Sequence, residues 1–188
     1  MNTLDAIGDA LPQYARDLKL NLSSVLSAPG APGLTDRQIW AVALAAAAAS
    51  RNPAFTAEIE ALAAAHLDAP HRQAAHAAAA IMGMNNVYYR FVHLVGDAEY
   101  ASLPARLRMN VIGNPGIAKV DFELLSLAVS AINGCGSCIA AHERQVRGQG
   151  MGREAVQSAV RIAATVHAVA RVLEATRFAD TEPAAEAA

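Results

Sequence analysis

The chain has 188 residues, of which 54% are hydrophobic, so it is long and apolar enough to form one sizeable core. Its formal net charge of −2 excludes a strongly basic surface and indicates neither nucleic acid nor an anionic membrane as a partner. It shows neither a signal-peptide pattern nor a run of about 18 strongly apolar residues, and we therefore expect a cytoplasmic protein with reduced cysteines.

The N-terminal part of the chain predicts two helices joined by a loop. Apolar residues at helical spacing predict an amphipathic helix over residues 3–19. Two prolines and two glycines within residues 28–33 indicate the loop. Thr35 and Gln38 have the spacing of a capping box, and the helix that they begin is expected to continue through an alanine tract to about Ser50.

The rest of the chain also predicts helices. No alternating strand pattern persists, and the abundant alanine favours helix over strand. Further helices are expected over residues 53–67, 68–82, 85–95, 121–132, 135–147 and 153–177, with one or two short helices over 98–112 and a frayed tail over 180–188. The predicted fold class is therefore all-α.

The second half of the chain repeats the pattern of the first, with Asp121 in the place of Asp36. The order of predicted helices and breaks is kept over residues 36–95 and 121–178, which indicates an internal duplication. We predict a single domain over residues 1–188 that is built of these two pseudo-repeats. The second repeat holds both cysteines and is expected to carry the active site.

Residues 132–144 contain the strongest chemical signal in the chain. Cys135 and Cys138 are its two cysteines, and His142 follows one helical turn later. On a helix these three side chains fall within an arc of roughly 60°. A Cys-x-x-Cys pair can cycle between dithiol and disulfide, and a nearby histidine can accept or return a proton. This arrangement predicts redox or peroxide chemistry.

The two cysteines allow three other interpretations. A structural disulfide would close a very short loop and would restrict the unfolded chain little. A zinc site would need further Cys or His ligands at fixed spacing, which the other histidines do not show, and we predict no metal. Two inert buried thiols are the third interpretation.

Three further side chains outside this motif are candidates for buried polar roles. Glu123 lies among apolar residues on the preceding predicted helix, so its carboxylate is either partly buried with a task or exposed near a helix N-terminus. His93 sits beside tyrosines and an arginine and is expected to pack in the core rather than to line a pocket or an interface. His167 lies in an apolar helix and is expected to be a hydrogen-bonded core residue.

Three stretches of the sequence resemble one family. They are Val-Asp-Phe-Glu-Leu-Leu-Ser-Leu-Ala-Val-Ser-Ala-Ile-Asn-Gly-Cys-Gly-Ser-Cys-Ile-Ala-Ala-His-Glu over 120–143, Met-Asn-Val-Ile-Gly-Asn-Pro-Gly over 109–116 and Met-Asn-Asn-Val-Tyr-Tyr-Arg over 84–90. The chain resembles the alkyl hydroperoxide reductase D proteins, or alkylhydroperoxidases, of the carboxymuconolactone decarboxylase superfamily. The resemblance covers essentially the whole chain.

The resemblance implies an all-helical, duplicated fold assembled as a homotrimer. It implies that a dithiol reduces organic hydroperoxides and also reduces a partner peroxiredoxin, alkyl hydroperoxide reductase C. Electrons would come from dihydrolipoamide on the lipoylated acyltransferase component of a 2-oxo-acid dehydrogenase, which dihydrolipoamide dehydrogenase reduces in turn. No bound cofactor is implied.

The resemblance also implies roles for four residues. Cys138 would form the sulfenic acid and would link to the partner, and Cys135 would be the proton donor and resolving thiol. His142 and Glu123 match the proton relay of the family. A helix-terminal position would instead favour Cys135 as the more acidic thiol, so the two lines of reasoning differ here.

One position departs from the family pattern. Some members have histidine directly before the second cysteine, where this chain has Ser137. A hydroxyl can orient water but cannot hold a proton near neutral pH. The alternatives are therefore a disulfide reductase or adaptor with little peroxidase activity of its own, a decarboxylase-like member that needs no thiol pair, and a purely structural or binding role.

Overall fold

The computed structural model describes residues 3–179, and within that range it contains helices and no strand. The all-α prediction is confirmed. The elements are α1 (Leu4–Asp9), a 3₁₀ turn η1 (Gln13–Ala15), α2 (Arg16–Val25), α3 (Asp36–Ala49), α4 (Pro53–Ala63), α5 (Ala69–Val95), α6 (Ala98–Ser102), α7 (Asn110–Gly113), α8 (Lys119–Asn133), α9 (Gly136–Gly148) and α10 (Arg153–Ala179). The predicted tail, residues 180–188, lies outside the described residues.

The helices α3 and α8 form the centre of the molecule. Each has a run of consecutive buried residues, Ile39–Ala47 in α3 and Phe122–Ser130 in α8. A helix that is buried on every face lies inside a fold rather than on its surface, and both helices pack against α5 and α10 as well as against each other. The small alanine side chains of α3 allow the neighbouring helices to approach closely.

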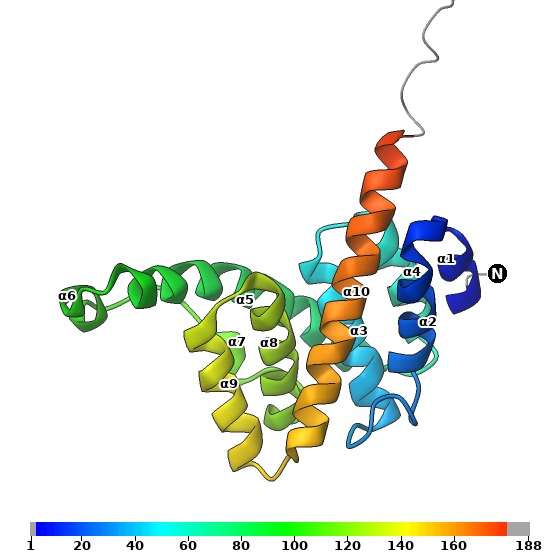
Figure 1. The fold of residues 1–188 in the computed structure, drawn as a ribbon. Helices are drawn as coiled ribbons and strands as arrows, with labels where there is room; N and C mark the ends of the chain where they lie inside the picture. Colours follow the sequence, from blue (N-terminus) through cyan, green and yellow to red (C-terminus); the bar gives the residue numbers. More distant parts are fainter. Residues whose placement is uncertain (1–2, 180–188) are drawn as a thin grey trace, which may run out of the picture.

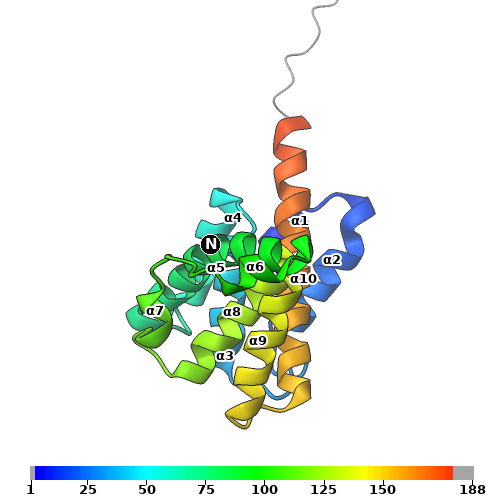
Figure 2. The ribbon, with the colours of Figure 1, turned by 90° about the vertical axis from the view of Figure 1, so that its left-hand side faces the viewer.

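The remaining helices surround this centre. The N-terminal helix α2 packs on α10, and α9 packs on α8 and α5. In Figure 1 the second half of α5 projects sideways from the body and carries α6 at its tip. Figure 2 looks along this projection and shows α8 and α9 beneath α5. No helix in the described part of the chain has an apolar stretch long enough to span a membrane.

The single helix predicted over residues 3–19 is wrong. The structure has α1, then the turn η1, then α2, which continues to Val25. Pro12 adopts an extended conformation with ψ of 161°, has no backbone N–H to donate, and disfavours helical geometry at the residue before it. The apolar spacing on both sides of the proline is helical, but the backbone cannot join the two segments.

The break predicted between residues 82 and 85 is also wrong. The structure has one continuous helix, α5, over Ala69–Val95. Asn85 and Asn86 are buried within it, and Asn86 is held by hydrogen bonds to α8. Tertiary contacts therefore override the weak helix propensity of the two asparagines. The predicted end at Gly96 is confirmed, with a φ of 71°.

Each of the two predicted pseudo-repeats contains two shorter helices followed by a long one. The helices α3, α4 and α5 are followed by α8, α9 and α10, and α5 and α10 each have 27 residues. The predicted capping box is present, since Thr35 Oγ1 accepts from Gln38 N–H and Gln38 Oε1 accepts from Thr35 N–H. Gln38 also donates to Asp121 across the two halves, at 2.7 Å. The duplication itself stays a prediction.

Removing the cap of α5 is expected to lower stability in a pH-dependent way. Asp68 accepts hydrogen bonds from the ring and the backbone N–H of His71, which hold the pKa of its carboxyl below the ordinary value of 3.8. We expect Asp68→Ala to lower the midpoint of thermal unfolding by about 2–4 °C at pH 7. Because a depressed pKa stabilises the fold above the unfolded-state value, this difference should narrow as the pH falls below about 4.

Scanning calorimetry from pH 7 to pH 3 measures this effect. Asp68→Asn is the matched control, because it keeps an oxygen acceptor for the cap but has no charge to titrate. A difference between Asp68→Ala and the parent protein that stays constant over this range would contradict the prediction.

Candidate active site

The two cysteines lie at the turn between α8 and α9. Gly134 ends α8 with a φ of 69°, a left-handed conformation that glycine adopts without strain. Cys135 is the N-cap of α9, and its sulfur accepts from the backbone N–H of Cys138 at 3.4 Å. Cys138 therefore lies in the first turn of α9, the position in which the sequence predicted Cys135.

Cys135 and Cys138 are joined by a disulfide, with their Cα atoms 5.3 Å apart. Cys135 is fully buried, whereas Cys138 is 7% exposed. Of the two, Cys138 lines a cavity of about 290 Å³. The cavity therefore offers a small molecule access to one sulfur and not to the other, which bears on which cysteine attacks.

The partly buried His142 pairs with the buried Glu123 beside this cavity. His142 lies on α9 and lines the same cavity as Cys138, and its Nδ1 is 2.7 Å from Glu123 Oε2. Glu123 is 4% exposed, so the interpretation of a solvent-facing acid is wrong. An ionised carboxylate only accepts hydrogen bonds, which places the proton of this contact on Nδ1 and fixes the orientation of the ring.

The other ring nitrogen of His142 faces a methionine. His142 Nε2 is 3.3 Å from Met82 Sδ, and Met82 is 1% exposed. Met82 therefore packs from α5 against the imidazole on α9. Ser137, which takes the place of the family histidine, has its Oγ 3.5 Å from Cys135 Sγ.

Five further residues of the cavity were not predicted from the sequence as site residues. They line it together with Met82, Ser137, Cys138 and His142, and they are Asn85, Tyr89, Met109, Ile112 and Ala141. Asn85 is buried, and its Oδ1 has no hydrogen-bond partner among the described residues. A signal for these positions existed, since residues 84–90 and 109–116 carry the family resemblance and 82, 85 and 89 share one helix face.

A buried polar network supports the cysteine turn from α5. Asn86 Nδ2 donates to Ser130 Oγ at 2.9 Å, and Asn86 Oδ1 accepts from Asn133 Nδ2 at 2.9 Å. Arg90 donates to the carbonyl oxygen of Asn133 at 2.6 Å. The backbone N–H of Cys135 in turn donates to the carbonyl of Ser130. These contacts hold the end of α8, and with it the start of the Cys-x-x-Cys motif.

Breaking this network is expected to destabilise the protein. Asn86 is 1% exposed, so Asn86→Ala leaves a cavity and removes a hydrogen-bond partner from the buried Ser130 and from the partly buried Asn133. We expect a loss of about 2–3 kcal/mol in the free energy of unfolding. Urea unfolding followed by circular dichroism measures it, with Gln73→Ala as the control because Gln73 is an exposed residue on the same helix. Equal losses in the two variants would contradict the prediction.

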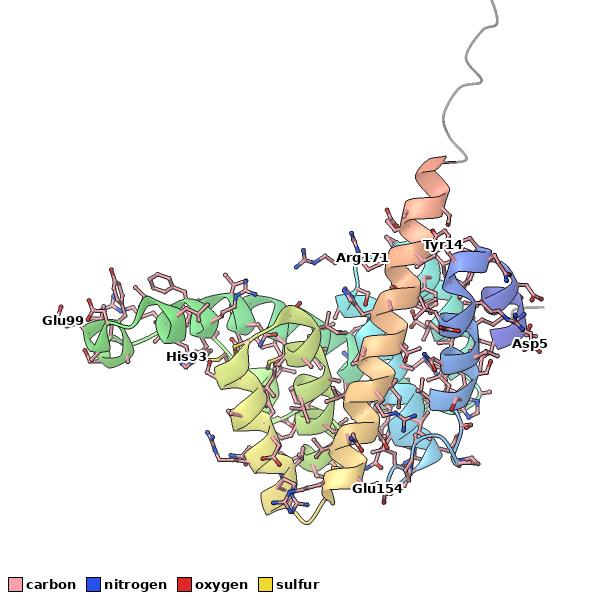
Figure 3. The ribbon with its side chains drawn as sticks, in the orientation of Figure 1. Asp5, Tyr14, His93, Glu99, Glu154 and Arg171 are labelled. Carbon is pink, nitrogen blue, oxygen red and sulfur yellow. A yellow bond between two sulfur atoms is a disulfide. The ribbon has the colours of Figure 1, made fainter. Side chains whose placement is uncertain are left out.

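The two remaining histidine predictions have different outcomes. His93 is exposed on the projecting part of α5 (Figure 3), so the prediction that it packs in the core is wrong. That part of α5 extends past the body of the protein, so nothing covers His93 among residues 3–179. His167 is hydrogen-bonded as predicted, with Nδ1 3.1 Å from Ser50 Oγ, and is half-buried.

Comparisons with known proteins show the family to which this chain is similar. The sequence matches the Carboxymuconolactone decarboxylase family over residues 98–181. It is 60% identical to an alkyl hydroperoxide reductase AhpD from Rhodospirillum centenum, over 92% of this chain and 91% of the relative. It is 56% identical to one from Maricaulis maris over 92% and 98%, and 53% identical to one from Anaeromyxobacter sp. (strain K) over the full length of both. The chain therefore belongs to the alkyl hydroperoxide reductase AhpD family.

Proposed function

We propose that this protein reduces organic hydroperoxides with the Cys135–Cys138 pair and returns to the dithiol with electrons from dihydrolipoamide. The observation that carries the proposal is the position of Cys138. Its side chain lines a cavity that His142 also lines, and His142 is oriented by the buried carboxylate of Glu123. A thiol, a base and a fixed acid beside one cavity are the groups that thiol-dependent peroxide reduction needs.

The cavity favours peroxides that carry an apolar group. Most of its lining is apolar, from Met82, Tyr89, Met109, Ile112 and Ala141. Burial of an alkyl or aryl group here would gain about 25 cal/mol for each Å² of apolar surface removed from water. An organic hydroperoxide therefore gains binding free energy that hydrogen peroxide cannot.

The proposed reaction has three steps. The Cys138 thiolate attacks the terminal peroxide oxygen, the O–O bond breaks, and the leaving alkoxide takes a proton to become the alcohol, which leaves Cys138 as a sulfenic acid. The Cys135 thiol attacks that sulfenic acid, forming the disulfide and releasing water. Dihydrolipoamide then reduces the disulfide by thiol exchange and becomes lipoamide. His142, held by Glu123, accepts the proton of the Cys138 thiol and returns it to the alkoxide.

We place this reaction in a chain of electron carriers. The lipoylated acyltransferase component supplies dihydrolipoamide, dihydrolipoamide dehydrogenase regenerates it, and the peroxiredoxin alkyl hydroperoxide reductase C is a second acceptor of electrons from the Cys135–Cys138 dithiol. The name of the relatives, alkyl hydroperoxide reductase, supports a hydroperoxide as the final electron acceptor. Such chemistry needs a compartment in which thiols are kept reduced, which the cytoplasm provides.

Consumption of cumene hydroperoxide with dihydrolipoamide as the sole reductant tests the proposal. We expect catalytic turnover that continues through many equivalents of peroxide, and none when dihydrolipoamide is omitted. Alkylation of the reduced protein with iodoacetamide should abolish the activity. Activity that survives alkylation would overturn the proposal and favour the decarboxylase-like alternative, which needs no thiol.

The adaptor role is the second candidate, and Ser137 favours it. The residue beside the reactive sulfur is a hydroxyl rather than an imidazole, so proton transfer during peroxide attack has one relay group fewer. If the adaptor role dominates, peroxide turnover without the peroxiredoxin is slow, and Cys135→Ser protein traps a mixed disulfide between Cys138 and the peroxiredoxin. Mass spectrometry of the trapped complex identifies the linked cysteines.

We also propose that the chain assembles as a homotrimer. An apolar face runs along the projecting half of α5 and its tip, and it remains uncovered in the single chain. Its members are 42–72% exposed, and they are Val87, Phe91, Leu94, Val95, Tyr100 and Leu103. A patch of this kind usually marks an interface. Light scattering after size exclusion should give three times the chain mass of 19.6 kDa, and Leu94→Asp should shift it towards the monomer.

A further inference from the structure

A second cavity, of about 340 Å³, lies on the other side of α5 from the cysteine pocket. Gly83, Asn86, Val87 and Arg90 line this cavity, whereas Met82, Asn85 and Tyr89 line the cysteine pocket. These two sets of positions lie on different faces of one helix. We propose that the second cavity, which we call the arginine cavity, binds a small polyanion that carries a phosphate group or several carboxylates.

The charge of the arginine cavity carries this proposal. Three guanidinium groups line it, Arg51 from the turn before α4, Arg90 from α5 and Arg171 from α10, and no Asp or Glu is among its lining residues. Figure 3 shows Arg171 on the side of α10 that faces the projecting half of α5. Three like charges around one half-open cavity repel one another, and a bound anion removes that repulsion.

These arginines are largely free to bind a ligand. Arg90 uses one N–H to cap the end of α8 through the carbonyl of Asn133. Among the side chains that the structure describes, which end at residue 176, neither Arg51 nor Arg171 has a hydrogen-bond or ion-pair partner. Each guanidinium has five donors in a planar fork that matches phosphate and carboxylate oxygens. The cavity therefore presents many charge-assisted donors at one place.

The backbone at Arg51 is strained. Its φ is 62°, a left-handed backbone conformation that is unfavourable for L-residues other than glycine. The position directly follows Ser50, the C-cap of α3, where glycine is the usual residue. The chain thus holds a charged side chain beside the cavity at a position that glycine would occupy with less strain, and a ligand that needs this charge explains the arrangement.

His167 adds a proton-linked donor to the arginine cavity. The Ser50 hydroxyl donates to the carbonyl of Ala46, so it accepts from His167 Nδ1–H, and Nε2 is the nitrogen left to take up a proton. Burial, and then the charge of Arg171, hold the pKa of His167 below its usual value. The charged residues that line the cavity together with His167 are Arg171 on its own helix and Arg51 and Arg90 from neighbouring elements. A bound anion offsets this repulsion and raises the pKa, so protonation strengthens binding.

Isothermal titration calorimetry of the full-length protein at low ionic strength tests the proposal, with inorganic phosphate, sulfate and citrate as probes. We expect saturable binding with one site per chain. Arg51→Gly and Arg171→Gln should each weaken it at least tenfold, which is about 1.4 kcal/mol. Arg51→Gly relieves the backbone strain, so its midpoint of thermal unfolding should not fall, and lost binding cannot then be ascribed to misfolding.

The controls separate this site from the cysteine pocket. Arg153→Gln, an exposed arginine on α10 outside the cavity, should bind as the parent does. So should Cys138→Ser, whatever its effect on peroxide turnover, because Cys138 lines the other cavity. Tighter binding of phosphate than of citrate assigns a phosphate-bearing ligand, and the reverse assigns a polycarboxylate.

Sulfate keeps its charge from pH 6 to pH 8, so its affinity reports the protein alone. The affinity for sulfate should weaken as the pH rises through this range, and the affinity of His167→Gln protein should not change with pH. The proposal is overturned if none of the three probes binds saturably, or if Arg51→Gly and Arg171→Gln bind as tightly as the parent protein.

Discussion

Replacing Cys138 with serine is expected to lower peroxide turnover by about 1,000-fold or more. Cys138 is the cysteine that lines the cavity, whereas Cys135 is fully buried behind it. Serine keeps the size of the side chain, but its hydroxyl does not ionise near neutral pH, so the nucleophile is lost and the shape of the cavity is kept. Cumene hydroperoxide consumption with dihydrolipoamide measures the effect.

Two further variants show whether the loss of turnover is specific to the Cys138 thiol. Ser137→Ala changes a neighbouring lining residue and keeps both sulfurs, so its turnover should stay within about threefold of the parent rate. Cys135→Ser should still reduce one equivalent of peroxide per chain and then stop, because the sulfenic acid on Cys138 has no resolving thiol. Cys138→Ser protein that turns over at the parent rate would show that another group attacks the peroxide.

Replacing Glu123 with glutamine is expected to lower turnover by about 100-fold. The Glu123 carboxylate accepts from His142 Nδ1 at 2.7 Å and is almost fully buried. When His142 takes the thiol proton it becomes a partly buried cation, and the carboxylate is its counter-ion. Glutamine keeps the hydrogen bond and the volume but removes the charge, so the variant isolates the electrostatic part of the interaction.

The measurement for Glu123 is kcat at saturating dihydrolipoamide, together with the rate at which the reduced thiols react with iodoacetamide. Both should fall, since both depend on the thiolate that the pair helps to form. Glu143→Gln is the matched control, because Glu143 lies on α9 and pairs with Arg147 away from the cavity, at 3.8 Å. A Glu123→Gln protein with parent kcat would remove the carboxylate from the mechanism.

Local patterns predicted much of the fold. Hydrogen bonds between neighbours in sequence decide where α3 and α5 begin, through Thr35 with Gln38 and through Asp68 with His71. Such contacts form within one helical turn, so the residue types and their spacing reveal them. Local patterns also gave the two wrong predictions about helices, the single helix over residues 3–19 and the break between residues 82 and 85. Pro12 breaks a segment whose apolar spacing is helical, and distant contacts of Asn86 keep α5 intact where its residues favour a break.

The sequence by itself determined the helical class, the family and the Cys-x-x-Cys motif with its histidine one turn away, because each of these depends on residues close together in the chain. Only the tertiary structure decided that Cys138 rather than Cys135 lines the cavity, that Glu123 is buried against His142, and that three arginines from different segments share a second cavity. The exposure of a side chain and the charges around it depend on which helices pack together. Helix packing joins residues that are far apart in sequence, and the sequence spacing of such residues does not reveal their contacts.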